Sequence, residues 1–270
     1  MSVNGKSRRS VARSALLGVL MLGVAAPGFG LAQPASAQDV TEEGPKGLVI
    51  AYRADPSRRA DFRRFMISEH AAMLRKLEAE GKLESFRLFY SWYAQPKVWD
   101  AMVELRFTGT SQLLAWNRLE QEAPGGLSKA GQALAQPVLT SSVDRVFSNG
   151  KQDGPEAERS TYYVIPYEFV SAGEYRDYAK AYVVPQYEGW LKSGLLASYE
   201  ILFNRYPVGD PWDSFVILQY RDADAFGKRQ KILDEVRKGF VNNAVWQAYH
   251  KRKSEIRSET ENSIADLIAR

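Results

Sequence analysis

The chain has 270 residues, of which 45% are hydrophobic, 25% charged and 12% aromatic, the composition of an ordinary globular protein. It has no cysteine and only two histidines, which excludes disulfides and thiolate nucleophiles and leaves little basis for a zinc site. Four of the 36 Lys and Arg residues lie before residue 38 and all 32 Asp and Glu residues lie after it, so the rest of the chain is close to neutral. Attraction to nucleic acid or anionic lipid therefore has no overall electrostatic basis.

The first 37 residues have the pattern of a secretory signal. A basic stretch ends at Arg13, an apolar run covers residues 15–24, and Ala35-Ser36-Ala37 matches a cleavage site. We therefore predict a signal peptide at 1–37, a flexible N-terminus at 38–45, and a periplasmic or secreted protein. Glycines and a proline interrupt the apolar run, which argues against a stable membrane anchor. Arg8-Arg9 resembles a twin-arginine export signal, with an ordinary basic leader as the alternative.

The next part of the chain predicts the element order β-α-β-β-α-β. Alternating apolar residues indicate strands, and apolar residues three and four apart indicate helices. Gly81 is expected to end the first helix, and Thr110 with Ser111 to cap the second. The expected elements are a strand at 47–53, a helix at 62–77, strands at 83–93 and 99–107, a helix at 110–119 and a strand at 138–147.

The second half predicts the same order. Its expected elements are a strand at 161–167, a helix at 175–191, strands at 198–203 and 212–220, a helix at 223–236, a further helical stretch around 240–249 and a short strand near 256. The halves also match residue by residue at an offset of 113, as Gly81 matches Gly194 and Trp99-Asp100 matches Trp212-Asp213. We interpret the chain as a tandem duplication of a whole folding unit.

The duplication sets the predicted boundaries between two repeats, a linker and a tail. The polar, turn-rich segment around Gly150 separates the halves. We predict a first α+β repeat at 46–148, a linker at 149–159, a second α+β repeat at 160–262 and a C-terminal tail at 263–270.

Each repeat predicts a ferredoxin-like fold, an antiparallel sheet with both helices on one face. The other face of the sheet must find a partner. Two repeats in one chain supply it, so we expect an α+β fold in which the two sheets pack together. The halves are then related by a pseudo-two-fold axis, as in a fused homodimer, with a cleft between each sheet and its own helices.

The topology, the repeat length and the helix pattern Phe62, Phe65, His70, Leu74 and Gly81 resemble the dimeric α+β barrel superfamily. This superfamily includes antibiotic-biosynthesis monooxygenases, muconolactone isomerases, EthD-type proteins and haem-dependent chlorite dismutases. The resemblance covers almost the whole chain after the signal and implies a fused dimeric α+β barrel. Because the superfamily hosts unrelated chemistries, it implies no single reaction.

His70 is the first candidate catalytic residue, because its counterpart in the second half is Val183. In the EthD-type pattern this helix histidine points toward the cleft, so the resemblance implies a general base or a hydrogen-bond donor. A core histidine bonded to a backbone carbonyl is the alternative. Tyr52 and Tyr90, on the first two strands, are expected to line the same cleft and contact the substrate.

The second half offers its own set of candidates. Glu200 falls on the opposite strand face from Tyr199 and Ile201, and a carboxyl there, among aromatic residues, would have a raised pKa and act as an acid or base. A partly exposed glutamate beside an arginine is the alternative. The candidate substrate-binding residues of this half are Tyr163, Tyr167 and Arg205.

The repeated pair Trp99-Asp100 and Trp212-Asp213 is interpreted as scaffold. We expect the indoles to pack under the sheet edge and the carboxylates to tie the preceding loops.

Cofactor motifs are lacking from the sequence, which shows no dinucleotide fingerprint, phosphate loop or nucleophile elbow. We expect no metal and no cofactor, with haem disfavoured but not excluded, since His250 is the other histidine and haem-binding relatives use an axial histidine.

Three functions remain open. One is an exported, cofactor-independent enzyme that acts on a small apolar or aromatic molecule by proton transfer, as an isomerase, lyase or monooxygenase. Another is a ligand-binding or stress-response protein without turnover, and a haem protein comes third. The expected partner is a small apolar or aromatic ligand and not nucleic acid. We expect the chain to be a monomer or to form a higher-order homo-oligomer.

Overall fold

The computed structural model describes residues 46–209 and 212–270. The predicted signal peptide 1–37 and N-terminal segment 38–45 lie outside the described residues.

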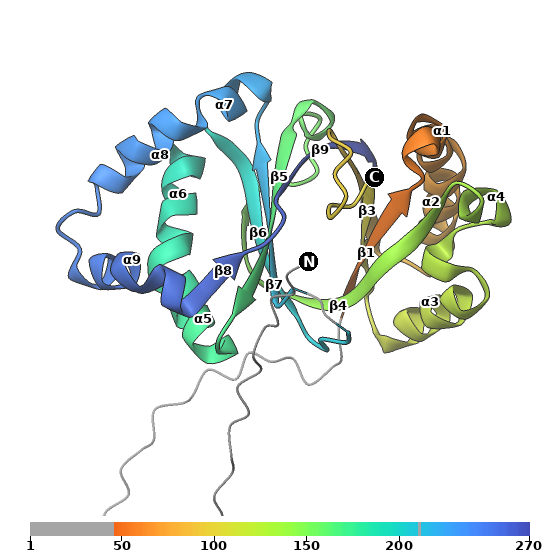
Figure 1. Ribbon diagram of the computed structural model, residues 1–270, viewed down its shortest axis with the longest axis horizontal. Helices are drawn as coiled ribbons and strands as arrows, with labels where there is room; N and C mark the ends of the chain where they lie inside the picture. Colours follow the sequence, from red (N-terminus) through yellow and green to blue (C-terminus); the bar gives the residue numbers. More distant parts are fainter. Residues whose placement is uncertain (1–45, 210–211) are drawn as a thin grey trace, which may run out of the picture. The chain divides into compact units, whose positions relative to one another are not determined.

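Both halves contain the predicted order of strands and helices (Figure 1). The first half consists of β1 Gly47–Ala54, η1 Pro56–Arg58, α1 Arg59–Phe65, η2 Met66–His70, α2 Ala71–Ala79, β2 Ser85–Ser91, β3 Ala101–Arg106, α3 Thr110–Glu122, η3 Pro124–Gly126, α4 Lys129–Gln132 and β4 Ala135–Gly150. The second half consists of η4 Ala157–Arg159, β5 Thr161–Phe169, α5 Ala172–Tyr178, η5 Ala179–Val183, α6 Val184–Lys192, β6 Leu196–Asn204, β7 Ser214–Tyr220, α7 Ala223–Gly227, α8 Arg229–Lys238, α9 Ala244–Ile256, β8 Arg257–Glu259 and β9 Ser263–Ala269.

The strands form one closed antiparallel barrel. Their order is β7-β6-β4-β1-β3-β2-β9-β5, and β5 also pairs with β7, which completes the ring; β8 continues the line of β9 beside β5. Closure leaves no free sheet edge among the barrel strands. The expected α+β barrel is therefore confirmed, with the two sheets joined edge to edge through β4–β6 and β2–β9.

The register of the sheet repeats with the sequence. In the first half Arg87 faces Glu104 across β2 and β3, and 113 residues later Glu200 faces Ile217 across β6 and β7. The π-helical segments η2 and η5 are separated by the same offset. The first strands differ, because the pairing of Gly47 with Arg106 corresponds to that of Tyr162 with Gln219, an offset of 115. The strand register and the π-helical segments thus repeat at the same offset of 113 as the sequence.

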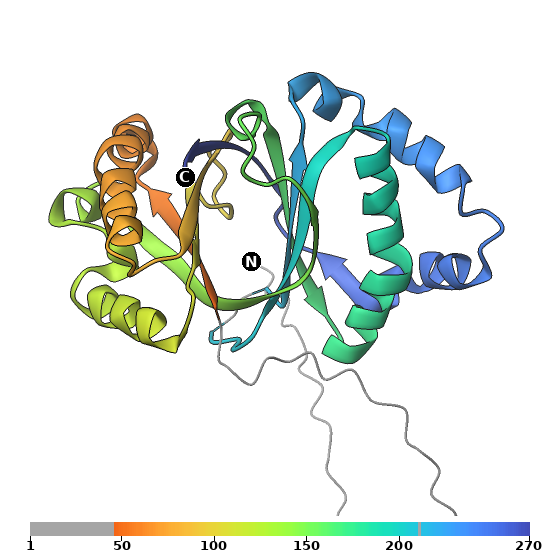
Figure 2. The same ribbon diagram turned by 180° about the vertical axis from the view of Figure 1, so that it is seen from behind.

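The helices cover the barrel on two opposite sides. Figures 1 and 2 show α1 to α4 outside the first half and α5 to α9 outside the second. Three apolar clusters result from this arrangement, one under each helix layer and one inside the barrel. Strands such as β3 and β7 have one face toward the helices and one toward the barrel interior and are buried on both faces, whereas β4 is partly exposed along its length.

Three details differ from the sequence predictions. The expected tail at 263–270 is largely β9, because Ala265 and Leu267 are apolar on one face and their strand fills the gap between β2 and β5. The residue before α3 is Gly109, so Thr110 begins that helix and does not cap it through its side chain. The predicted linker begins inside β4, which extends to Gly150.

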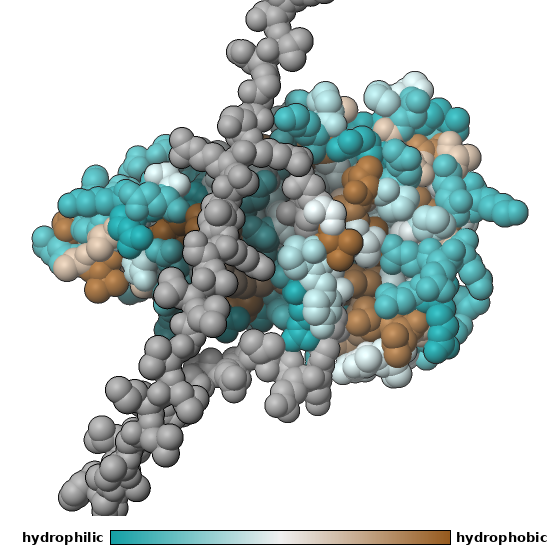
Figure 3. Space-filling model, turned by 60° about the horizontal axis from the view of Figure 1, so that its bottom comes forward, coloured by the Kyte–Doolittle hydropathy of each residue, from teal (hydrophilic) through white to brown (hydrophobic). Residues whose placement is uncertain are grey.

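The surface carries no dominant apolar patch on the face in Figure 3, where apolar side chains form separate groups among hydrophilic ones. Within the described ranges, the chain has no helix with the length and apolar character needed to span a bilayer.

Candidate functional site

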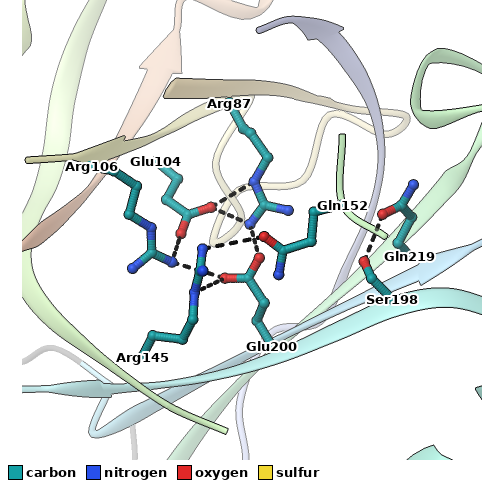
Figure 4. Close-up of polar contacts among 8 residues, drawn as sticks. All are labelled: Arg87, Glu104, Arg106, Arg145, Gln152, Ser198, Glu200 and Gln219. Carbon is teal, nitrogen blue, oxygen red and sulfur yellow. Dashed lines mark hydrogen bonds and ion pairs between the residues drawn. The ribbon is translucent and has the colours of Figure 1, made fainter. Parts of the chain in front are cut away.

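The barrel interior has a charged end and an apolar end. Glu104 and Arg106 on β3, Arg87 on β2 and Glu200 on β6 point into the charged end, as Figure 4 shows. Neighbouring residues of the same strands point the opposite way, since Leu88 and Leu105 pack under the first helix layer. Strand alternation therefore places these charges inside the barrel.

The charged end is an ion network that joins the two halves. Arg87 donates through Nε to Oε2 of Glu104 at 2.8 Å, and its Nη2 lies 2.6 Å from Oε1 of Glu200. Nη2 of Arg106 contacts Glu104 and lies 2.8 Å from Oε2 of Glu200. Nε of Arg145 lies 3.2 Å from the same Glu200 oxygen. One carboxylate of the second half thus binds three guanidinium groups of the first.

A β-bulge brings Arg145 into this network. The register of β4 against β6 shifts between Arg145 and Phe147. Without that extra residue, side chains two apart would lie on the same face of the strand. With it, Phe147 packs under the second helix layer while Arg145 reaches Glu200 inside.

Burial sets the electrostatics of the network. Burial alone would raise the pKa of Glu104, but the guanidinium groups of Arg106 and Arg87 outweigh it and lower that pKa to about 2. For Glu200, burial raises the pKa and the nearby carboxylate of Glu104 adds to the effect, against the attraction of Arg87. The sequence prediction of a raised Glu200 pKa therefore has the right direction, although its neighbours are arginines and not aromatic rings.

The apolar end contains a cavity of about 620 Å³. Its floor includes Val49, Ala51, Met102 and Phe215, from strands of both halves. Its volume lies within the usual range of small-molecule sites. Trp99 and Trp212 also line the cavity. Its charged lining residues are Arg53, Lys97, Glu168, Glu259 and Glu261.

The two tryptophans occupy equivalent positions in the halves and are each 8% exposed. Trp99 and Trp212 line the cavity, whereas we expected them under the sheet edge. The carboxylates that follow them are structural, as predicted, but they hold the ends of neighbouring strands. Asp100 accepts from the Ala54 N–H at 2.9 Å, and Asp213 from the Phe169 N–H at 2.9 Å.

His70 lies outside the barrel, in the first helix layer, and is 2% exposed. Its ring contacts Tyr52 at 5.8 Å and Phe65 at 6.3 Å between centroids. Burial lowers its pKa to about 4, so the imidazole is neutral at pH 7. Nε2 is buried without a hydrogen-bond partner in the described ranges.

Tyr52 and Tyr90 share that layer with His70. The hydroxyl of Tyr52 donates to the carbonyl of Gly125 at 2.6 Å, and burial raises its pKa. The hydroxyl of Tyr90 donates to the carbonyl of Arg59 at 2.6 Å. Glu200 lies across the sheet inside the barrel, so the structure separates it from the His70 group.

The remaining candidates lie apart from one another. Tyr163 accepts from Asn262 at 2.9 Å on the outer face of β5, and Tyr167 lies in the second helix layer. Arg205 pairs with Asp144 at 2.9 Å. These residues do not form one site with Glu200.

The residues around His250 do not fit a haem. The ring of His250 stacks on Trp246 with centroids 5.1 Å apart, and its Nδ1 lies 2.9 Å from the hydroxyl of Tyr182. Tyr182 in turn stacks on Trp246 at 4.6 Å. A porphyrin needs an open slot beside its axial ligand, whereas aromatic side chains occupy this layer. Among the described residues, no group of three or more His, Cys, Asp or Glu side chains is placed to hold a metal ion.

Sequence reasoning missed Arg87, Glu104, Arg106 and Arg145. A signal was present, because Arg87, Glu104 and Arg106 occupy the strand face that was expected to be buried against the other sheet. Charged residues on such a face are expensive unless they are paired, so they predict a buried network.

Comparisons with known proteins agree on the fold. No family model matches the sequence, and no curated protein matches it. A solved structure of an anthrone oxidase-like protein has a TM-score of 0.55 and 9% identity, over 84% of this chain and 92% of that one. A "Putative monooxygenase" of Fusobacterium nucleatum has a TM-score of 0.50 and 8% identity, over 84% and 94%. A haem-binding protein from Thermus thermophilus has a TM-score of 0.45 and 17% identity, over 83% and 91%.

The closed barrel of two ferredoxin-like halves is a dimeric α+β barrel, a fold shared with the anthrone oxidase-like protein and with the "Putative monooxygenase". The resemblance inferred from the sequence is thus confirmed at the level of fold.

Proposed function

We propose that the protein binds a small, flat, mainly apolar molecule at the apolar end of the barrel. The observation that carries this proposal is the cavity of about 620 Å³ with Trp99 and Trp212 on its walls. Two indoles from equivalent loops border the cavity, and an aromatic ring bound there would pack against their accessible edges.

The polar groups of the cavity narrow the class of ligand. Nε1 of Trp99 and Nε of Arg53 are buried donors without a hydrogen-bond partner among the described residues. A ligand with a carbonyl or phenolic oxygen would supply the acceptor that they lack after a small side-chain movement. Glu168 and Glu261 lie on the same cavity and disfavour a strongly anionic ligand. An aromatic ketone, quinone or phenol fits this pattern best.

The test is calorimetric titration with 1,4-naphthoquinone, a flat molecule with two carbonyl acceptors. Because the chain has no cysteine, the quinone has no thiol to modify. Trp99→Leu and Trp212→Leu should each weaken binding about tenfold, the effect of losing one aromatic contact. Ala51→Phe should block the cavity floor.

Trp246→Phe is the matched control, since Trp246 lies in the second helix layer. The proposal fails if naphthoquinone gives no saturable heat, or if the Trp99 and Trp212 variants bind as tightly as the control.

A second candidate is a cofactor-independent enzyme with His70 as general base. It is favoured by the unpartnered, neutral Nε2 of His70 and by a fold shared with an anthrone oxidase-like protein and with a "Putative monooxygenase". Since His70 is 2% exposed, a substrate reaches it only if the helix layer opens.

Oxygen uptake in the presence of anthrone tests the enzymatic candidate. His70→Asn should lower the rate about 100-fold or more, in the range of general-base removal, while the melting temperature stays within a few degrees. Uptake that survives this substitution would exclude His70 as the base. Trp99→Leu separates this candidate from the first, because it changes binding in the barrel and not His70.

Export is part of the proposal as well, supported by the basic, apolar and Ala35-Ser36-Ala37 pattern of residues 1–37. The N-terminal sequence of the protein recovered from the periplasm should begin near Gln38. Recovery of the full-length chain from the cytoplasm alone would contradict it.

A further inference from the structure

The charged end of the barrel holds more hydrogen-bond donors than its own carboxylates use. Arg87 is 6% exposed, yet its Nη1 has no hydrogen-bond partner in the described part of the chain. Nε of Arg106 is also buried and unpartnered there. Guanidinium N–H groups are strong donors that rarely stay buried without an acceptor.

The network contains more arginine than glutamate side chains. Arg87, Arg106 and Arg145 face only the two carboxylates of Glu104 and Glu200, as Figure 4 shows. When both carboxylates are ionised, the one positive charge in excess is carried by Arg145, whose side chain is 36% exposed. The buried part of the network, Arg87 and Arg106 with Glu104 and Glu200, is balanced in charge. The unpartnered N–H groups of the two arginines are therefore what favours a bound acceptor.

A separate cavity of about 330 Å³ lies against these groups. Arg87, Arg106 and Arg145 all line it, together with Lys46. The acidic side chains on it are Glu84, Glu104 and Asp153. The space is thus mixed in charge, with the unpartnered guanidinium groups among its walls.

We propose that this cavity is a binding site for a small oxyanion, a carboxylate or phosphate group held by the guanidinium groups of Arg87 and Arg106. Planar guanidinium groups match the geometry of two oxygens on one carbon or phosphorus. Glu84 and Asp153 repel a second negative charge, so a monoanion binds more tightly than a dianion.

The site is specific to one half of the barrel. The positions equivalent to Arg106 and Glu104 in the second half hold Gln219 and Ile217. There Gln219 accepts from the Ser198 hydroxyl at 2.6 Å and donates to Ser160 at 3.0 Å, so its amide is used within the chain. The unpartnered Nε of Arg106 thus lies at the position where the second half has a glutamine with a satisfied amide.

The experiment follows the side-chain Nε–H signals of ¹⁵N-labelled protein during titration with sodium acetate and, separately, with sodium phosphate. Both titrations are run in a chloride buffer of constant ionic strength. We expect the Arg106 signal to move saturably with acetate, and phosphate to bind more tightly at pH 6 than at pH 8, where it is mainly a dianion. Arg252, on the exposed surface of α9, provides an internal reference signal.

The variants separate a built site from general attraction of anions. Arg106→Gln introduces the residue that the second half already accepts at the equivalent position, and it should weaken acetate binding at least about tenfold. Arg145→Gln removes the excess positive charge from a partly exposed position and serves if the first variant does not fold. Arg205→Gln, away from this cavity, should bind acetate as the wild type does.

The proposal is overturned if neither anion moves the Arg106 signal saturably, or if Arg145→Gln and Arg205→Gln bind acetate equally. A shift with phosphate alone would identify a phosphate group as the ligand, and a shift with acetate alone a carboxylate. Because the naphthoquinone cavity has a different lining, its binding is measured independently and each proposal fails by itself.

Discussion

The two ends of the barrel interior use the same strands in opposite ways. At the apolar end both halves keep a tryptophan at the equivalent position, Trp99 and Trp212, around an open cavity. At the charged end the equivalent positions differ, since Arg87 corresponds to Glu200 and the two form an ion pair. A symmetric dimer would place like beside like at these positions, and two halves in one chain can place opposite charges together.

This difference has a physical consequence for stability. The apolar end is held by contact area, which tolerates changes of shape at moderate cost. The charged end is held by a few buried ion pairs, which are costly to break one partner at a time. The two ends should therefore respond very differently to substitutions of similar size.

The largest effect should come from Glu200→Gln. It removes the carboxylate that binds Arg87, Arg106 and Arg145 and leaves buried positive charge uncompensated. We expect a loss of about 3–5 kcal/mol in the free energy of unfolding, measured in urea. Glu235→Gln, at an exposed position of α8, is the control and should change it by less than about 0.5 kcal/mol.

A double substitution sharpens the same point. Arg87→Met with Glu200→Met removes both partners, so the loss should be smaller than the sum of the two single losses by about 2 kcal/mol or more. Additive losses would mean that the contact between Arg87 and Glu200 contributes little.

The next effect is the pH dependence of stability that comes from His70, in the helix layer outside the barrel. His70 has a folded-state pKa of about 4, below its unfolded value near 6.5. The unfolded chain therefore gains a proton first as the pH falls, and the stability that His70 contributes above pH 6.5 is lost between pH 6.5 and 4. The loss should amount to about 3 kcal/mol.

This pH effect is read as the difference between the wild type and His70→Phe in urea unfolding at several pH values. The contribution of Glu200 to the pH dependence is present in both proteins and cancels in that difference. This matters because the raised pKa of Glu200 acts in the opposite direction and favours the folded state at low pH. Parallel stability curves for the two proteins would show that His70 is not buried as a neutral imidazole.

A smaller effect is expected at the apolar end. Met102 is fully buried on the cavity floor, and Met102→Leu keeps its volume and apolar character. The free energy of unfolding should fall by less than about 1.5 kcal/mol, measured as for Glu200→Gln. A loss equal to that of Glu200→Gln would remove the contrast between the two ends.

The smallest effect should come from the rim of the apolar cavity. Nζ of Lys97 lies 3.6 Å from Oε1 of Glu261, and the two side chains are 80% and 46% exposed. Lys97→Gln should change the free energy of unfolding by less than about 0.5 kcal/mol. A larger loss would show that the rim holds the barrel together.

Much of the fold was predictable from local patterns. Alternating apolar residues such as Leu88 and Leu105 predicted strands, and the helical spacing of Phe62 and Phe65 predicted a helix. The offset of 113 predicted that the second half repeats these elements. The strand at 263–269 was not predicted, because its alternation is short and its partners β2 and β5 lie far away in the sequence.

The candidate site was predictable only in part. Glu200 was identified by its strand face, but its partners come from three strands of the other half.

The sequence by itself determined most of the element order, the offset of 113 between the halves, and the strand face on which Glu200 lies. These follow from local periodicity, since side chains alternate along every strand. Only the tertiary structure decided that His70 and Glu200 lie on opposite sides of one sheet and that Trp99 and Trp212 line a cavity. Those facts depend on how the barrel closes, which long-range strand pairing sets and local sequence does not encode.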